Sequence, residues 1–253
     1  QTIATIDIMN SSGLNPIYTP SNCSPSLRLN WVLTLFWKEP ITSIDWIDEL
    51  KTVTAVDGVK IIRHQTTRPR ISLFYLSTVP DLAPRDIIKS VKGRLQHIIR
   101  NKQPKAFQRN YYLHSIGRSR RKTIERYVKS QLDHHQMADP KVQTKLSRYQ
   151  IKNSKIDLSR TVKSAHGMYI YNLHLVLVNA GRWHEIRDEI LMKIKNMISA
   201  VACKKEHRLS AAGIFPDHIH LSLGGSISES PEEIALAYLN NLAYAQGQKP
   251  IYQ

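Results

Sequence analysis

The stretch Met168–Val178, MYIYNLHLVLV, alternates apolar and polar residues over most of its length. This period of two is typical of a β-strand with one face against a core and the other face open. A similar β-rich run, LRLNWVLTLFW, spans Leu27–Trp37. Each run is followed by a helical pattern, by further strand, and by a proline-led turn into a second helix. The sequence therefore predicts the same small unit twice.

The elements of the first unit are expected at 44–53 (helix), 59–63 and 71–77 (strands) and 85–100 (helix). Those of the second unit are expected at 184–205 (helix), 219–223 (strand) and 232–245 (helix). Pro84 and Pro231 begin corresponding helices, and each helix has acidic residues in its first turn. Units of this order form a small antiparallel sheet with helices on one face, so the predicted fold class is α+β.

The predicted domain organisation has four parts. An N-terminal extension covers 1–26, the first unit 27–136, a basic linker 137–164 and the second unit 165–253. The linker is polar and basic with little periodicity. The first unit closes with a short strand, Tyr111–Gly117, and a helical pattern over 118–135, for which Ser119 is a candidate N-cap.

Positive charge is concentrated in the middle of the chain. The 253 residues include 36 Lys and Arg against 20 Asp and Glu, a net charge of +16. Residues 85–163 hold 21 of these basic and 5 of these acidic residues, so this segment carries the whole net charge. Such concentration predicts a polyanionic partner, above all nucleic acid. A membrane is not expected, because no apolar stretch could span it and no amphipathic stretch has a basic face.

A pair of histidines marks the second unit. FPDHIHL, Phe215–Leu221, places His218 and His220 at i and i+2, so both imidazoles share one face of a strand while Ile219 points into the core. Two neutral imidazoles suit a divalent cation that has a third ligand, although such histidines are as often structural. The equivalent part of the first unit, Arg70–Phe74, has no histidine and cannot form the same site.

A tyrosine marks the helix over 118–135. Tyr127, Gln131 and either His134 or His135 share one helical face. Because a phenol has an ordinary pKa of about 10, it needs positive surroundings or a metal to attack as phenolate. The basic side chains expected to contact nucleic acid are Lys89, Lys92, Arg94, Arg118, Arg120, Arg121, Lys122, Arg126 and Lys129.

These motifs resemble those of the single-tyrosine HUH transposases of small insertion sequences and of the related REP-associated tyrosine transposases. PDHIHL at 216–221 is similar to their histidine–hydrophobe–histidine motif. YYLHSIG at 111–117 and YVKSQ at 127–131 resemble the strand and helix that carry the nucleophile, and DIIKSVKGR at 86–94 resembles a further helix. The resemblance covers roughly residues 27–135 and 167–247.

The resemblance implies ferredoxin-like (RRM-like) sheets that bind single-stranded DNA, with a hairpin in the target. It implies a metal-dependent single-stranded DNA endonuclease and strand transferase in the prokaryotic cytoplasm, associated with the nucleoid. His218, His220 and Gln131 would hold Mg²⁺ or Mn²⁺, and Tyr127 would form a 5′-phosphotyrosine link. RNA is an alternative partner.

One departure from the family pattern shapes the expected assembly. Family members combine the histidines of one subunit with the tyrosine of another. Here the first unit keeps the tyrosine without the histidines, and the second keeps the histidines without a tyrosine helix. We therefore expect an intramolecular pseudo-dimer with one composite site, in which His218 and His220 meet Tyr127 and Gln131.

Three other functions are compatible with the sequence. The first is a catalytically inactive, transposase-derived protein that binds DNA or structured RNA. The second is an RNA-binding protein that presents Trp31, Tyr75 or Tyr171 on a sheet surface. The third, a zinc hydrolase built on His218, His220 and His207, is disfavoured because no general-base carboxylate stands at motif spacing.

Overall fold

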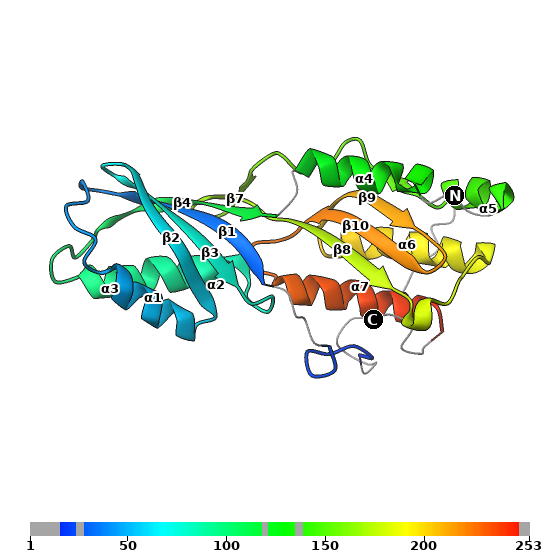
Figure 1. Cartoon of the computed structure of the whole chain (residues 1–253), viewed down its shortest axis with the longest axis horizontal. Helices are drawn as coiled ribbons and strands as arrows, with labels where there is room; N and C mark the ends of the chain where they lie inside the picture. Colours follow the sequence, from blue (N-terminus) through cyan, green and yellow to red (C-terminus); the bar gives the residue numbers. More distant parts are fainter. Residues whose placement is uncertain (1–15, 24–27, 118–120, 135–138, 248–253) are drawn as a thin grey trace.

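Two β-sheets lie end to end along the long axis of the molecule, with helices packed against them (Figure 1). The structure is a computed structural model, and it describes residues 16–23, 28–117, 121–134 and 139–247. Within these residues, no helix is both long and apolar enough to cross a membrane. The chain thus has a mixed α/β fold with two sheets.

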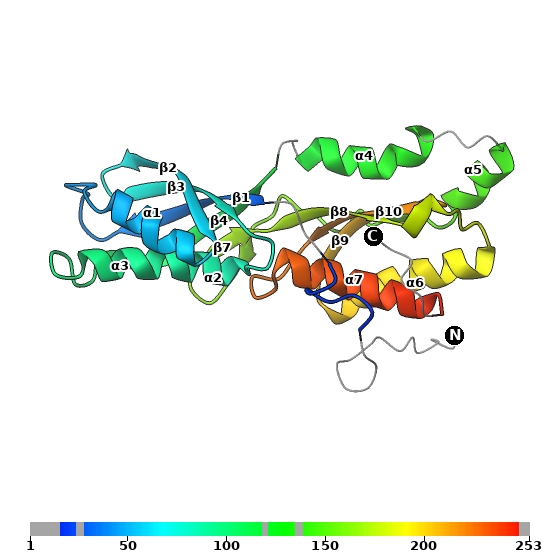
Figure 2. The same cartoon turned by 60° about the horizontal axis from the view of Figure 1, so that its bottom comes forward.

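The first sheet has the strand order β2-β3-β1-β4-β7-β6. Its strands are β1 (Leu29–Trp37), β2 (Val59–Arg68), β3 (Ile71–Thr78), β4 (Phe107–Ile116), β6 (Val162–Lys163) and β7 (Met168–Ile170). Its helical layer consists of α1 (Ile47–Val56), α2 (Pro84–Ile88), the π-helix η1 (Lys89–Gly93) and α3 (Arg94–Ile99). The strands and helices predicted for the first unit are present, with shifted ends, and one face of the sheet carries the helices (Figure 2).

The second sheet has the order β5-β9-β10-β8. Its strands are β5 (Ile151–Lys152), β8 (Asn172–Val178), β9 (Arg208–Ile214) and β10 (His218–Gly224). The 3-10 helix η2 (Ala180–Arg182) follows β8, and α6 (Asp188–Lys204) and α7 (Pro231–Ala245) cover one face of this sheet. Helix α4 (Arg121–His134) lies on the opposite face (Figure 2). The sequence interpretation did not include β9.

The segment predicted as a linker, 137–164, contains regular structure. Helix α5 (Pro140–Ser147) begins at the N-cap Asp139, whose side chain accepts a hydrogen bond from the Lys141 backbone N–H at 2.8 Å. β5 then pairs with β9, and β6 pairs with β7. The segment therefore adds a short strand to each sheet.

An almost continuous strand joins the two sheets. Only Tyr171 separates β7, which runs parallel to β4, from β8, which is antiparallel to β10. Tyr171 is fully buried, and its ring centroid lies 5.3 Å from that of Trp31. A Cβ atom on Gly225 would come within 2.7 Å of the Tyr171 ring, so this contact requires glycine.

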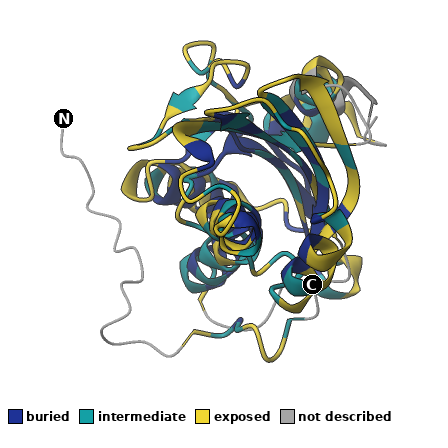
Figure 3. Cartoon of the chain, turned by 90° about the vertical axis from the view of Figure 1, so that its left-hand side faces the viewer, coloured by how far each residue is buried: buried dark blue, intermediate teal, exposed yellow. Residues whose placement is uncertain are grey.

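The core lies between the sheets and the layer of helices α1–α3, α6 and α7, as the buried residues in Figure 3 show. Trp31 and Tyr171 belong to this core, which contradicts their candidacy as exposed nucleic-acid-stacking residues. Tyr75 is only half-buried and lies on the other face of the first sheet. At the N-terminal end of the described residues, Tyr18 is buried and exchanges two 2.8 Å hydrogen bonds with Asn240.

Candidate active site

The two motif histidines lie side by side on β10. His218 and His220 point to the face that carries α4, and their ring centroids are 4.9 Å apart. Ile219, between them, points to the opposite face and is buried in the core. Both histidines are themselves buried, with 8% and 6% of their surface exposed. The shared face predicted from the period of two is therefore present.

His218 is held by groups on both sides of its ring. Its Nδ1 donates to Asp217 Oδ1 at 2.6 Å, and Phe215 stacks on the ring at 4.8 Å. Asp217 Oδ2 in turn accepts from Arg182 at 3.1 Å. Burial opposes ionisation of Asp217, but the hydrogen bonds from His218 and Arg182 outweigh it and lower the pKa of this carboxyl. An ionised Asp217 keeps the proton of His218 on Nδ1, so Nε2 is the nitrogen suited to a cation.

A third histidine, His174 on β8, belongs to the same cluster. In the register of β8 and β10, His220 pairs with Val176 and Ser222 pairs with His174, which makes His174 a diagonal neighbour of His220. The two imidazoles stack with centroids 5.2 Å apart, and His174 Nε2 shares a hydrogen bond of 2.9 Å with His220 Nδ1. Burial lowers the pKa of His174 and favours its neutral form.

Tyr127 reaches this cluster from α4. Its ring stands edge-on to that of His220, with centroids 5.8 Å apart, and 6.4 Å from that of His174. The next residue, Val128, is buried where α4 packs on β9 and β10. Ala211 and Gly213 of β9 pair with Ser222 and His220, and these small residues allow the helix to approach the sheet closely. Tyr127 itself is 42% exposed, so an external molecule can reach it.

The side chain of Gln131, the predicted third metal ligand, lies outside the described residues. Gln131 is one helical turn after Tyr127 on α4, and the side chains of His134 and His135 also lie outside the described residues. Among the residues that the structure describes, no three His, Cys, Asp or Glu side chains are grouped to hold a metal ion. The third donor is therefore not among the described His, Cys, Asp and Glu side chains, and the amide of Gln131 stays the predicted one.

The predicted nucleic-acid contacts fall into distinct groups. Lys122 and Arg126 are exposed on α4, beside Tyr127. Arg118 and Arg120 lie outside the described residues, and the side chains of Arg121 and Lys129 are also not described.

The helical layer carries the remaining three, Lys89, Lys92 and Arg94, on the side away from α4 (Figure 2). Lys92 donates to the backbone oxygens of Gln108 and Arg109 at 2.6 and 3.0 Å, and burial lowers its pKa. Arg94 forms an ion pair with Asp57 at 2.9 Å. Lys89 is exposed, but the positions of these three residues do not support their predicted contact with nucleic acid near Tyr127.

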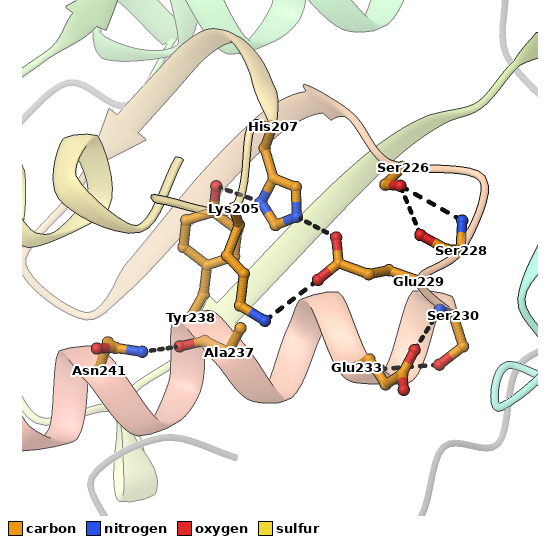
Figure 4. A network of polar contacts seen from close by, with 10 residues as sticks. All are labelled: Lys205, His207, Ser226, Ser228, Glu229, Ser230, Glu233, Ala237, Tyr238 and Asn241. Carbon is orange, nitrogen blue, oxygen red and sulfur yellow. Dashed lines mark hydrogen bonds and ion pairs between the residues drawn. The ribbon is translucent and has the colours of Figure 1, made fainter. Parts of the chain in front are cut away.

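His207 belongs to a different network (Figure 4). Its Nε2 lies 3.0 Å from Glu229 Oε2 and its Nδ1 3.2 Å from the Tyr238 hydroxyl, while Glu229 also pairs with Lys205 at 3.2 Å. This network lies between the end of α6 and helix α7. His207 thus does not join His218 and His220, and a zinc site of these three residues is contradicted by the structure.

Comparisons with known proteins connect part of the chain to transposases. Residues 167–242 match the family described as "Transposase IS200 like", a stretch that contains His174, His218 and His220 but not Tyr127. A crystal structure of a candidate transposase from Deinococcus radiodurans R1 is 16% identical over 43% of this chain and 95% of that chain, with a TM-score of 0.32, a likeness too low to carry an argument. No curated protein matches the chain in a sequence search. The second unit, with its three clustered histidines, is therefore the part that resembles the IS200-like transposases.

Proposed function

We propose that this chain is a metal-dependent single-stranded DNA endonuclease and strand transferase that acts through Tyr127. One observation carries the proposal: Tyr127, from a helix 91 residues before His218 in the sequence, lies with its ring 5.8 Å from that of His220. The match of residues 167–242 to IS200-like transposases supports transposase-type chemistry at the histidine pair. The net charge of +16 supports DNA as the substrate.

The donor groups fit a divalent metal. Asp217 engages Nδ1 of His218 and His174 engages Nδ1 of His220, as outer partners of metal-binding histidines commonly do. His218 and His220, with Gln131, would hold Mg²⁺ or Mn²⁺. When bound, the ion would withdraw negative charge from the scissile phosphate. Of these two ions, Mn²⁺ suits a mixed set of imidazole and oxygen donors better.

The proposed reaction is a transesterification. Tyr127 Oη attacks the phosphorus, and its proton passes to the solvent that reaches this exposed side chain. The bond from phosphorus to the 3′ oxygen breaks, and that oxygen leaves with the electron pair and takes up a proton. The products are a 5′-phosphate ester of Tyr127 and a 3′-hydroxyl. In strand transfer, the 3′-hydroxyl of another strand attacks the ester and releases Tyr127.

The topology supports two ferredoxin-like units in a pseudo-dimer. The first unit runs β1-α1-β2-β3, then helices, then β4, and its antiparallel strands have the order β2-β3-β1-β4. The second runs β8-α6-β9-β10-α7 with the order β9-β10-β8, the same arrangement without a fourth strand. When Pro84 is aligned with Pro231, Ile71 and Leu73 occupy the positions of His218 and His220. Since the first unit has no histidines there, the pseudo-dimer would contain one composite site, with His218 and His220 from the second unit and Tyr127 from the first.

A covalent-capture experiment tests the proposal without knowledge of the target sequence. The chain is incubated with Mn²⁺ or Mg²⁺ and a single-stranded DNA library that contains randomised segments and a hairpin, and the products are separated under denaturing conditions. We expect a label at the 3′ end of the DNA to migrate with the protein and a label at the 5′ end to be released. His218→Ala and omission of metal should each abolish the adduct. A library that binds but gives no adduct in either metal would establish the inactive, nucleic-acid-binding alternative instead.

A further inference from the structure

One face of the first sheet, opposite α1–α3, has no helix over it among the described residues (Figure 2). We call it the open face. The strand registers place its side chains in rows across β2, β3, β1 and β4. One row reads Arg63–Tyr75–Val32–His114, and the next reads Gln65–Leu73–Thr34–Tyr112. All of the β3, β1 and β4 members of these rows are half-buried. The open face is therefore a surface of the molecule rather than a second core.

Aromatic rings occupy the centre of the open face. Tyr75 lies in the first row on β3, and Tyr112 and His114 lie on β4 with ring centroids 6.3 Å apart. Burial lowers the pKa of His114, which favours a neutral ring. Flat rings held on a sheet by their strands suit unpaired bases, because every base has a face that can stack on an aromatic side chain.

The charge of the open face is of one sign. The described strands of the first sheet, β1–β4 with β6 and β7, include no Asp or Glu. Lys60, Arg63 and Arg68 on the edge strand β2 are exposed, and their register partners Ser77, Tyr75 and Ile71 place all three on this face. At the other side of this face, the exposed Lys163 of β6 pairs with Met168 of β7, which in turn pairs with Tyr112. Rows of rings with basic side chains on both sides are complementary to a single strand of nucleic acid.

The open face is continuous with the candidate active site. Tyr112 and His114 of β4 pair with Met168 and Ile170 of β7, and the same strand continues through β8 to His174. His174 is four positions after Ile170, which is about 13 Å along an extended strand. Met168 at the start of this path and Val176, two residues beyond His174, are exposed apolar residues. A short oligonucleotide can therefore contact both Tyr127 and the aromatic rows.

From this arrangement we propose that the open face binds an unpaired stretch of the same single-stranded DNA that reaches Tyr127. Its bases stack on Tyr75, Tyr112 and His114, and its phosphates contact Lys60, Arg63 and Arg68. The first unit thus binds substrate with the surface that corresponds to the histidine face of the second unit. The identity of the strand rests on the proposed function, whereas stacking on the open face does not.

Two variants test the proposal, and each has a matched control. Tyr75→Leu with Tyr112→Leu removes the rings but keeps apolar side chains, and Tyr111→Leu with Tyr244→Leu is the control on other surfaces. Lys60→Gln, Arg63→Gln and Arg68→Gln remove the basic edge, and Arg100→Gln, Lys193→Gln and Lys204→Gln remove the same charge from the helical layer. The probe is fluorescein-labelled oligodeoxythymidine longer than the ~16 nucleotides that a single binding fold covers at most.

We expect affinity for this probe to fall at least about tenfold in the ring variant, since stacking contributes substantially for each base. The basic-edge variant should show a similar loss at low salt, and both controls should bind like the parent. Ultraviolet cross-linking of a probe that contains 5-iododeoxyuridine should modify peptides 71–78 and 107–116. Circular dichroism melting compares the folding of all variants.

The proposal is overturned if folded ring and basic-edge variants bind like the parent, or if cross-links avoid both peptides. It is also overturned if oligouridine or duplex DNA competes better than single-stranded DNA. Adduct formation separates this result from the proposed function. If the variants bind like the parent while the parent forms the Tyr127 adduct, the open-face proposal fails and the proposed function stands. If the variants lose binding while the parent forms no adduct, the open-face proposal is supported and the proposed function fails.

Discussion

The ring of Tyr127 stands edge-on to the ring of His220, at 84° and with centroids 5.8 Å apart. These residues belong to different predicted units, and the contact forms because α4 packs on β9 and β10 of the second sheet rather than on the sheet that contains β4. The buried Val128 holds this part of the helix in place. The tyrosine and the histidine pair are thus brought together within one chain.

Tyr127→Phe removes only the hydroxyl oxygen that the proposed reaction uses. We expect the variant to bind single-stranded DNA like the parent and to form no covalent adduct, as a denaturing gel would show. Tyr111→Phe is the matched control: it loses the hydrogen bond from Tyr111 Oη to Ser164 Oγ, 2.7 Å long, and should still react. Persistent adduct in Tyr127→Phe would move the nucleophile to another residue.

Intramolecular pairing of Tyr127 with His220 predicts the outcome of a mixing experiment. Tyr127→Phe and His220→Ala proteins each lack one half of the composite site. Mixed in equal amounts, they should form no adduct, because a complete site needs both residues from one chain. Recovery of adduct on simple mixing would instead indicate a site shared between separate chains.

The sequence predicted the major strands and helices where hydrophobic periodicity was strong. β9 was missed because Arg208–Ile214, RLSAAGI, is rich in small residues and has only one β-branched residue, so it has little intrinsic preference for a strand. Its pairing with both β10 and β5 establishes it as a strand. The small residues Ala211 and Gly213 lie where α4 packs, a requirement of tertiary structure that local propensity does not reveal.

The candidate site was only partly visible in the sequence for a similar reason. His218 and His220 stand in a recognisable motif, whereas His174 is a single polar residue in an alternating strand, where a histidine attracts no special interpretation. Only the register of β8 with β10 places it diagonal to His220. The hydrogen bonds of Lys92 to the β4 backbone and the ion pair of Arg94 with Asp57 were likewise hidden, because these partners are distant in sequence.

His174 is expected to position His220 for metal binding. If His220 binds a cation through Nε2, its Nδ1–H donates to His174 Nε2 across the observed 2.9 Å. His174→Ala should weaken Mn²⁺ binding by about 10–100-fold in calorimetry, the usual effect of losing such an outer partner. His174→Gln keeps an acceptor and should restore most of the affinity, while His97→Ala on α3 is a neutral control.

A spectroscopic measurement distinguishes this role of His174 from a purely structural one. The ¹⁵N chemical shifts of His220 in metal-free protein should indicate a proton on Nδ1 in the parent and in His174→Gln. In His174→Ala, the proton should be distributed over both ring nitrogens. Unchanged shifts in the alanine variant would show that His174 does not determine the tautomer of His220.

Glu229 makes stability depend on acid pH. The hydrogen bond with His207, 3.0 Å long, is the main cause that lowers the pKa of Glu229, and Lys205 contributes to it. Because the folded state lowers this pKa, the stabilisation is fully present above the ordinary pKa of about 4.3 and disappears as the pH falls through the lowered value. Glu229→Gln should cost about 1–3 kcal/mol at neutral pH and reduce the acid dependence of urea unfolding. Glu39→Gln, at an exposed ion pair with Arg70, is the control.

The exposed basic residues of α4 are expected to set part of the salt dependence of DNA binding. Lys122 and Arg126 are on the helix that carries Tyr127, close to where the scissile phosphate would lie. Neutralising one phosphate of a single strand contributes about 0.7 to the slope of log affinity against log salt concentration, so Lys122→Gln with Arg126→Gln should reduce that slope by about 1.4. Lys193→Gln with Lys204→Gln removes the same charge from α6, on the opposite face, and should leave the slope unchanged. Fluorescence anisotropy over a salt series measures both variants, and equal slopes for the two would show that the DNA does not pass along α4.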